Sequence, residues 1–121
     1  MKYEFKIVAF TEEAEFAISL ATECNKYGFL LSFIEKFEDI VNEMNTETIL
    51  VSLIDLNDKN YDAFNLCKKI KDKYTIPVFG VLNMFNKKIQ DEAKKAGYDL
   101  ILTKKMLLKS IREVVIHVSN E

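Results

Sequence analysis

The chain has 121 residues, of which 49% are hydrophobic, and its 17 basic and 19 acidic residues leave a net charge of −2. This length predicts one globular domain, residues 1–121. The nearly balanced charge argues against direct binding to nucleic acid or to an anionic membrane. No apolar stretch approaches the ~20 residues of a membrane span, and no signal-peptide pattern opens the chain. We therefore expect a cytoplasmic protein.

Apolar runs of strand length alternate with stretches of helical periodicity along the chain. The predicted strands, in chain order, are Phe5–Phe10, Phe29–Ile34, Ile49–Ile54, Val78–Leu82 and Leu100–Thr103. Each is followed by apolar residues at helical spacing, the second such stretch being Ile40, Val41 and Met44. Gly28 and Gly97 each follow a turn that contains lysine, where a left-handed residue commonly ends a helix.

This alternation of strands and helices predicts a parallel sheet with helices on both faces. The repeat is (βα)5, and for that repeat the flavodoxin-like strand order 2-1-3-4-5 is favoured. The predicted fold is therefore a three-layer α/β/α sandwich with a five-stranded parallel sheet. In that order the first and third strands are neighbours, so the residues that follow them meet at the carboxyl edge of the sheet, where open α/β folds bind ligands.

Charged residues follow the strands at this edge. Asp55 comes directly after the third strand, Lys104 after the fifth, and Thr11, Glu12 and Glu13 after the first. Carboxylates that converge from separate strands make an oxygen-rich cup suited to Mg²⁺. Asp55 would supply the attacking oxygen toward a phosphoryl group, and Lys104 would pair with the phosphoryl oxygens. We therefore expect Glu12, Asp55 and Lys104 to lie within a few ångströms of one another.

Three segments resemble the receiver domain of bacterial two-component response regulators, and the resemblance covers essentially the whole chain. The segment Asp55–Ile70 is similar to the phosphoacceptor stretch of that family, and Ile76–Asn83 matches its fourth strand. Gly97–Lys105 matches its Gly-Ala-x-x-Tyr-Leu-Thr-Lys-Pro signature, with Lys104 on the lysine. The resemblance implies a phosphorelay signalling module that is not an enzyme, beyond taking a phosphoryl group from a histidine kinase or a small phosphodonor.

The resemblance also implies roles for individual residues. It makes Asp55 the phosphorylation site and Lys104 the phosphate-pairing lysine. Mg²⁺ would be held by the side chains of Glu12 and Asp55 and by the backbone carbonyl of Asn57. In such domains the face formed by the last two helices and the fifth strand docks partners, which implies a homodimer or a complex with another signalling protein through that face.

The chain departs from the family at several positions, among them Lys59, Ala63 and Lys105 in the loops and three that bear directly on the site. Thr11 stands where the first aspartate of an acidic pair is expected, which implies weak Mg²⁺ binding. Leu82 stands where a serine or threonine hydroxyl would reach the phosphoryl group, and Ile101 replaces the aromatic residue that moves with it. Without those two groups the link between the site and a distant surface is weakened. We therefore expect an atypical receiver that acts through protein contacts.

Each site residue also has a plainer structural explanation. Asp55 could form an Asx-turn or cap a helix, and Lys104 could be a solvated lysine at a strand end. Glu12 and Glu13 could simply favour the dipole of the first helix, with Thr11 as its N-cap. For the whole chain, the alternative is a flavodoxin-like protein or enzyme that binds a nucleotide or another small ligand. That alternative calls for a glycine-rich phosphate loop after the first strand, where this chain has acidic residues.

Overall fold

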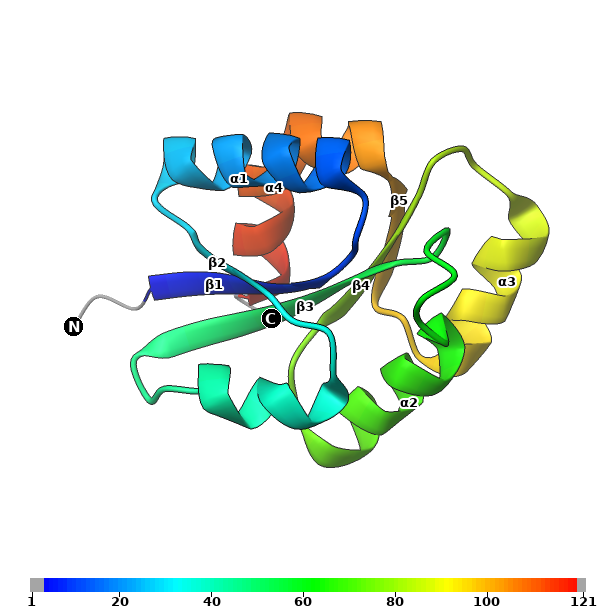
Figure 1. Cartoon of the computed structure of the whole chain (residues 1–121), viewed down its shortest axis with the longest axis horizontal. Coiled ribbons are helices and arrows are strands. Elements are labelled where there is room, and N and C mark those ends of the chain that lie inside the picture. Colours follow the sequence, from blue (N-terminus) through cyan, green and yellow to red (C-terminus); the bar gives the residue numbers. More distant parts are fainter. Residues whose placement is uncertain (1–3, 120–121) are drawn as a thin grey trace.

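The described residues, 4–119, form a sheet flanked by helices in this computed structural model (Figure 1). In chain order the elements are β1 (Glu4–Phe10), α1 (Ala14–Tyr27), β2 (Leu30–Phe33), the 3₁₀ helix η1 (Phe37–Glu43), β3 (Thr48–Asp55), α2 (Ala63–Lys73), β4 (Val78–Leu82), α3 (Lys87–Ala96), β5 (Leu100–Thr103) and α4 (Lys104–Ser119). The first three and the last two residues of the predicted domain, 1–121, lie outside the described residues.

The sheet has five parallel strands in the order β2-β1-β3-β4-β5. This confirms the predicted flavodoxin-like order and the parallel sheet. The register pairs Phe10 with Ile54 at the ends of β1 and β3, and Leu82 with Thr103 at the ends of β4 and β5. The four loops that follow these strands therefore leave the sheet at the same edge.

Helices cover both faces of the sheet, as Figure 1 shows, with α1 and α4 on one side and η1 and α2 on the other. The side chains of β3 alternate between the two cores. Val51 and Leu53 pack with α1 and α4, whereas Leu50 and Ile54 pack with the helices of the opposite face. Because both faces are covered, β3 is apolar on both sides, which explains its nearly unbroken hydrophobic sequence.

The second helical stretch differs from the prediction. Apolar residues at Ile40, Val41 and Met44 suggested an α-helix, but the segment forms the 3₁₀ helix η1, and Val41 and Met44 are exposed. A 3₁₀ helix has three residues per turn, so residues three apart share a face. Phe37, Ile40 and Glu43 share the inner face: Phe37 and Ile40 pack in the core, and Glu43 accepts a hydrogen bond from Lys6.

The two predicted glycines end their helices as expected. Gly28 (φ 72°) and Gly97 (φ 108°) end α1 and α3 in the left-handed conformation. Cys24 and Cys67 are buried free thiols, and burial raises the pKa of each to about 11. Within residues 4–119, the structure contains no helix of the length and hydropathy that a membrane span requires.

Gly80 in β4 provides a first testable prediction. A Cβ atom at this position would lie 2.9 Å from Leu56 Cδ1 and 3.0 Å from the ring of Tyr98. The ring is held in place, because the Tyr98 hydroxyl donates a hydrogen bond of 2.7 Å to the carbonyl of Ala63. We expect Gly80→Ala to lower the free energy of unfolding by about 1–3 kcal/mol, as measured by urea denaturation. An unchanged denaturation midpoint would contradict this packing.

Candidate functional site

The loops after β1, β3, β4 and β5 enclose a cavity at the carboxyl edge of the sheet. Its volume is about 280 Å³, and we call it the Asp55 cavity. It is lined by Glu12, Glu13, Asp55, Asn57, Asp58, Lys59, Asn60, Asn83 and Lys104. Carboxylates, amides and lysines thus converge from four separate segments, which the strand order brings together.

Asp55 lies at the bottom of this cavity and is 2% exposed. Its Oδ2 atom accepts a hydrogen bond of 2.8 Å from the Thr11 hydroxyl and lies 2.8 Å from the Lys104 ammonium. Its Oδ1 atom accepts the N–H of Asn57, two residues on, at 3.0 Å, which is the contact of an Asx-turn. One oxygen therefore shapes the loop, as the plainer explanation expected, while the other faces Thr11 and Lys104.

Lys104 is 9% exposed, so it is not the solvated strand-end lysine of the plainer explanation. Its ammonium lies between Asp55 and Glu13, at 2.5 Å from Glu13 Oε2, and 5.3 Å from the centre of the Phe16 ring. Burial alone would lower the pKa of Lys104, but the hydrogen bonds to Asp55 and Glu13 outweigh it and raise that pKa. The lysine is therefore a fixed cation at the bottom of the Asp55 cavity.

Two further contacts hold the loops around the cavity. The carboxylate of Asp58 accepts the backbone N–H of Glu12 at 2.7 Å and that of Asn60 at 2.9 Å. Burial tends to raise the pKa of Asp58, but these hydrogen bonds outweigh it and lower that pKa. The side-chain oxygen of Asn57 accepts the N–H of Asn83 at 2.6 Å, which ties the loop after β3 to the loop after β4.

Of the predicted cluster of Glu12, Asp55 and Lys104, the structure shows one direct contact, between Asp55 and Lys104. Asp55 and Lys104 are in contact, and Glu12 lines the same cavity, but the carboxylate that binds Lys104 belongs to Glu13. Thr11 is not the N-cap of α1, because Glu13 occupies that position. Instead the Thr11 hydroxyl accepts the Glu13 N–H at 3.3 Å and donates to Asp55.

The oxygen atoms that could ligate a metal in this cavity do not fit a tightly held Mg²⁺ ion. Among residues 4–119, no three acidic, histidine or cysteine side chains gather where they could hold a metal. Both oxygens of Asp55 already accept hydrogen bonds, and Thr11 places a donor where a second carboxylate would supply an acceptor. Of the predicted ligands, Glu12 and the carbonyl of Asn57 would be left to hold the ion largely by themselves.

Leu82 and Ile101, at which the resemblance implied a lost hydroxyl and a lost aromatic residue, lie on β4 and β5. Leu82 is 1% exposed at the end of β4, beside Thr103 of β5. Ile101 is half-buried and packs against the core on the α2 side of the sheet. Both positions are filled by aliphatic side chains, so neither offers a hydroxyl to a group bound at Asp55.

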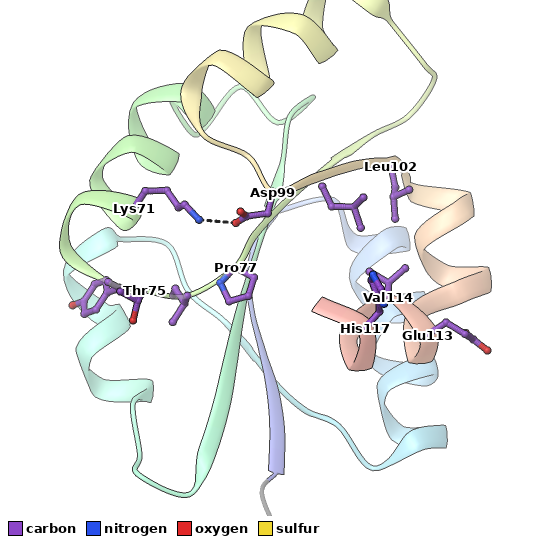
Figure 2. Close-up of a pocket in the computed structure, with 11 residues that line it drawn as sticks. Lys71, Thr75, Pro77, Asp99, Leu102, Glu113, Val114 and His117 are labelled. Carbon is purple, nitrogen blue, oxygen red and sulfur yellow. Dashed lines mark hydrogen bonds and ion pairs between the residues drawn. The ribbon is translucent and has the colours of Figure 1, made fainter. Parts of the chain in front are cut away.

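A larger groove of about 920 Å³ lies at the opposite edge of the sheet (Figure 2). Figure 2 shows Lys71 and Asp99 on one side of it, and Val114 and His117 of α4 on the other. The carboxylate of Asp99 binds Lys71 at 2.7 Å and the N–H of Val78 at 2.8 Å, so this ion pair holds the start of β4. The groove lies away from the strand ends that carry Asp55 and Lys104, so we regard the smaller cavity as the candidate site.

Neither the known family models nor the curated proteins match this sequence. Solved structures do match its fold. The signal receiver domain of the response regulator NarL from Mycobacterium tuberculosis is 13% identical and superimposes with a TM-score of 0.79 over 98% of both chains. The response regulator RPA3017, in red light signalling of R. palustris, is 16% identical, with a TM-score of 0.71 over 90% of both chains.

A third structure carries a modification of interest. It is a response regulator from Burkholderia pseudomallei with a phosphorylated aspartic acid, a calcium ion and citrate. It is 17% identical, and the match covers 93% of this chain and 66% of that chain with a TM-score of 0.73. At these identities the similarity establishes the architecture: the chain has the fold of a response-regulator receiver domain.

Proposed function

We propose that this chain is a signalling module of the two-component kind, in which Asp55 accepts a phosphoryl group. The observation that carries the proposal is the contact between the buried Asp55 carboxylate and the Lys104 ammonium at the carboxyl edge of a receiver fold. The donor would be a histidine kinase or a small phosphodonor. We regard the protein as a substrate in that reaction rather than as an enzyme.

The chemistry of the transfer follows from the contacts of Asp55. A carboxylate oxygen attacks the phosphorus atom, the bond from phosphorus to the donor breaks, and an acyl phosphate forms on Asp55. With phosphoramidate as the donor, the broken bond is P–N and ammonia leaves. Lys104, 2.8 Å from Oδ2 before the transfer, would offset the negative charge of the phosphoryl oxygens. Thr11 would keep the aspartate oriented through its hydroxyl.

Receiver domains commonly use Mg²⁺, which would further offset the phosphoryl charge when bound. In this chain the available ligands are Glu12, Asp55 and the carbonyl of Asn57. Because the oxygens of Asp55 already have partners and Thr11 replaces an acid, we propose that Mg²⁺ binds weakly here. Lys104, which is fixed in place and positively charged, would then carry most of the charge compensation.

We propose that the module passes its signal on by direct contact with another protein. The aliphatic Leu82 and Ile101 cannot report a phosphoryl group by a hydroxyl or aromatic switch. Near the Asp55 cavity, Met84 and Phe85 in the loop before α3 are 80% and 65% exposed, and Met106 at the start of α4 is 56% exposed. Exposed large apolar side chains of this kind fit a surface that docks a protein.

The docking surface would lie on the face formed by α3, β5 and α4. Met106 belongs to α4, and Met84 and Phe85 lie in the loop just before α3. A second copy of the chain or another signalling protein would dock there. We propose that the module works in the cytoplasm, without direct contact to nucleic acid or membrane. The alternative of a flavodoxin-like ligand-binding protein has less support, because the residues after β1 are acidic and the larger groove lies away from the usual ligand edge.

Labelling with phosphoramidate tests the proposal. We expect intact-mass spectrometry to detect one added phosphoryl group on the wild-type protein and none on Asp55→Asn. Asparagine keeps the size of the side chain and can accept the Thr11 hydrogen bond, but its amide is a poor nucleophile. Omitting Mg²⁺ should slow the labelling only slightly, because the cation in the cavity is already Lys104.

The same experiment can also refute the proposal. Equal labelling of wild type and Asp55→Asn would mean that another residue accepts the group. A wild-type protein that stays unlabelled at any Mg²⁺ concentration would rule out phosphoryl transfer to Asp55 and leave only the contact-based part of the proposal. A correctly folded Asp55→Asn control, checked by circular dichroism, excludes loss of structure as the reason for its lack of labelling.

A further inference from the structure

Two carboxylates hold Lys104. Its ammonium lies 2.8 Å from Asp55 Oδ2 and 2.5 Å from Glu13 Oε2. Measured over side-chain atoms alone, rather than over whole residues, the exposed fraction is 1% for Asp55, 11% for Lys104 and 44% for Glu13. Asp55 therefore contacts the ammonium from the interior, and Glu13 covers it from the solvent side.

The backbone leaves the Glu13 carboxylate available for this contact. Glu13 is the N-cap of α1, and side chains at N-caps often bind the free N–H groups of their own helix. The Glu13 side chain makes no such bond. Its backbone N–H is tied to the hydroxyl of Thr11 instead. The contact with Lys104, 91 residues away in sequence, therefore fixes the direction of the carboxylate.

An anion that enters the Asp55 cavity has to compete with Glu13. An ammonium group has three N–H donors, and Asp55 and Glu13 each accept from Lys104. Only one N–H donor of the ammonium is then left for a phosphate. The negatively charged Glu13 carboxylate also repels a phosphate at close range. The half-exposed Glu13 can swing into solvent, whereas the buried Asp55 cannot. Glu13 is therefore the partner that an incoming anion would displace.

We propose that the contact of Glu13 with Lys104, which we call the latch, prevents phosphate-type anions from binding the ammonium until the glutamate moves into solvent. The latch deepens the proposed function and rests on it, because it would regulate the access of a phosphoryl group to Asp55. Glu12 has the same charge and lines the same cavity, but the contact with Lys104 is made by Glu13. The two adjacent glutamates thus form a matched pair for a test.

The test is a titration with inorganic phosphate, followed by NMR of the Lys104 side-chain and backbone resonances. We expect Glu13→Gln to raise the apparent phosphate affinity about fivefold over wild type, a factor that corresponds to one partly exposed ion pair. Glu12→Gln removes the same charge from the cavity but leaves the Lys104–Glu13 contact in place, so without Mg²⁺ it should raise the affinity clearly less than Glu13→Gln. In the absence of phosphate, the Lys104 ammonium resonance should move in Glu13→Gln and stay in place in Glu12→Gln.

The labelling experiment separates this inference from the proposed function. If Glu13→Gln binds phosphate more tightly than wild type and is also labelled faster by phosphoramidate, the result supports both the latch and phosphoryl transfer to Asp55. If it binds phosphate more tightly but no variant is labelled, the latch stands and Asp55 is not a phosphoacceptor. Equal phosphate affinity of wild type and Glu13→Gln overturns the latch, whatever the labelling result. Glu13→Asp, which keeps the charge but has a shorter reach, should bind phosphate with intermediate affinity.

Discussion

Replacing Lys104 by methionine is expected to lower the free energy of unfolding by about 3–5 kcal/mol. The substitution keeps the aliphatic volume of the side chain but removes its charge. Asp55, which is 2% exposed, would then hold a buried carboxylate without a cation, and that desolvation cost is no longer offset. Chemical denaturation monitored by circular dichroism at neutral pH measures the change.

Two further variants form a double-mutant cycle with Lys104→Met. Asp55→Asn should cost less than Lys104→Met, because Lys104 keeps its contact with the half-exposed Glu13. The double variant Asp55→Asn/Lys104→Met should cost clearly less than the sum of the two single variants, since neither charge is then left unpaired. Costs that add within about 0.5 kcal/mol would mean that the two side chains are not coupled in the folded protein.

The direction in which the stability difference between wild type and Lys104→Met changes with pH can also be predicted. The pKa of Lys104 is raised from its ordinary value of 10.5 in the folded state, despite burial, by the hydrogen bonds to Asp55 and Glu13. A raised lysine pKa adds stability that is complete below the unfolded value and is lost as the pH rises through the folded value. The difference in stability between wild type and Lys104→Met should therefore stay constant near neutral pH and narrow only in alkaline solution.

The fold could be predicted from the sequence because the same pattern, an apolar run of strand length followed by a helical stretch, repeats along the whole chain. The run Ile49–Ile54 is apolar on both faces, which marks a central parallel strand, and the predicted Val78–Leu82 and Leu100–Thr103 have the observed bounds. The segment Phe37–Glu43 was misjudged because the spacing of Ile40, Val41 and Met44 favours an α-helix, although only Ile40 of the three is buried. The inner face of η1 ends in Glu43, which contacts Lys6 of β1, and local spacing does not encode that long-range contact.

The candidate site was predictable only in part, for a similar reason. Strand order alone places Asp55 and Lys104 at one edge, and their contact follows from it. The two consecutive glutamates after β1 are equivalent in the sequence, and the turn decides which of them faces Lys104. That turn is fixed by the hydrogen bond from the Glu12 N–H to Asp58 and by the bond from the Glu13 N–H to Thr11. Neither bond has a sequence signature, so the contact of Glu13 was missed.

Leu82→Ser, which introduces the hydroxyl that receiver domains usually carry at this position, is expected to destabilise the protein by about 3 kcal/mol or more. The wild-type side chain is 1% exposed at the end of β4. Serine removes most of its buried apolar surface, leaves a cavity and adds a polar group that burial penalises. Urea denaturation of Leu82→Ser, Leu82→Ala and Leu82→Met measures these effects separately.

The three variants at Leu82 test whether the end of β4 can accommodate a buried hydroxyl. Leu82→Met should cost less than about 1.5 kcal/mol, because it conserves volume, whereas Leu82→Ser should cost at least as much as Leu82→Ala because its hydroxyl is buried without a partner. If Leu82→Ser were instead more stable than Leu82→Ala, its hydroxyl would have found an acceptor near the Asp55 cavity. The site would then offer a partner to a hydroxyl at position 82, which would argue against the proposal that Leu82 excludes a hydroxyl switch. The expected order, with serine the least stable, would mean that the packing around the end of β4 favours leucine and offers no acceptor for a hydroxyl at this position.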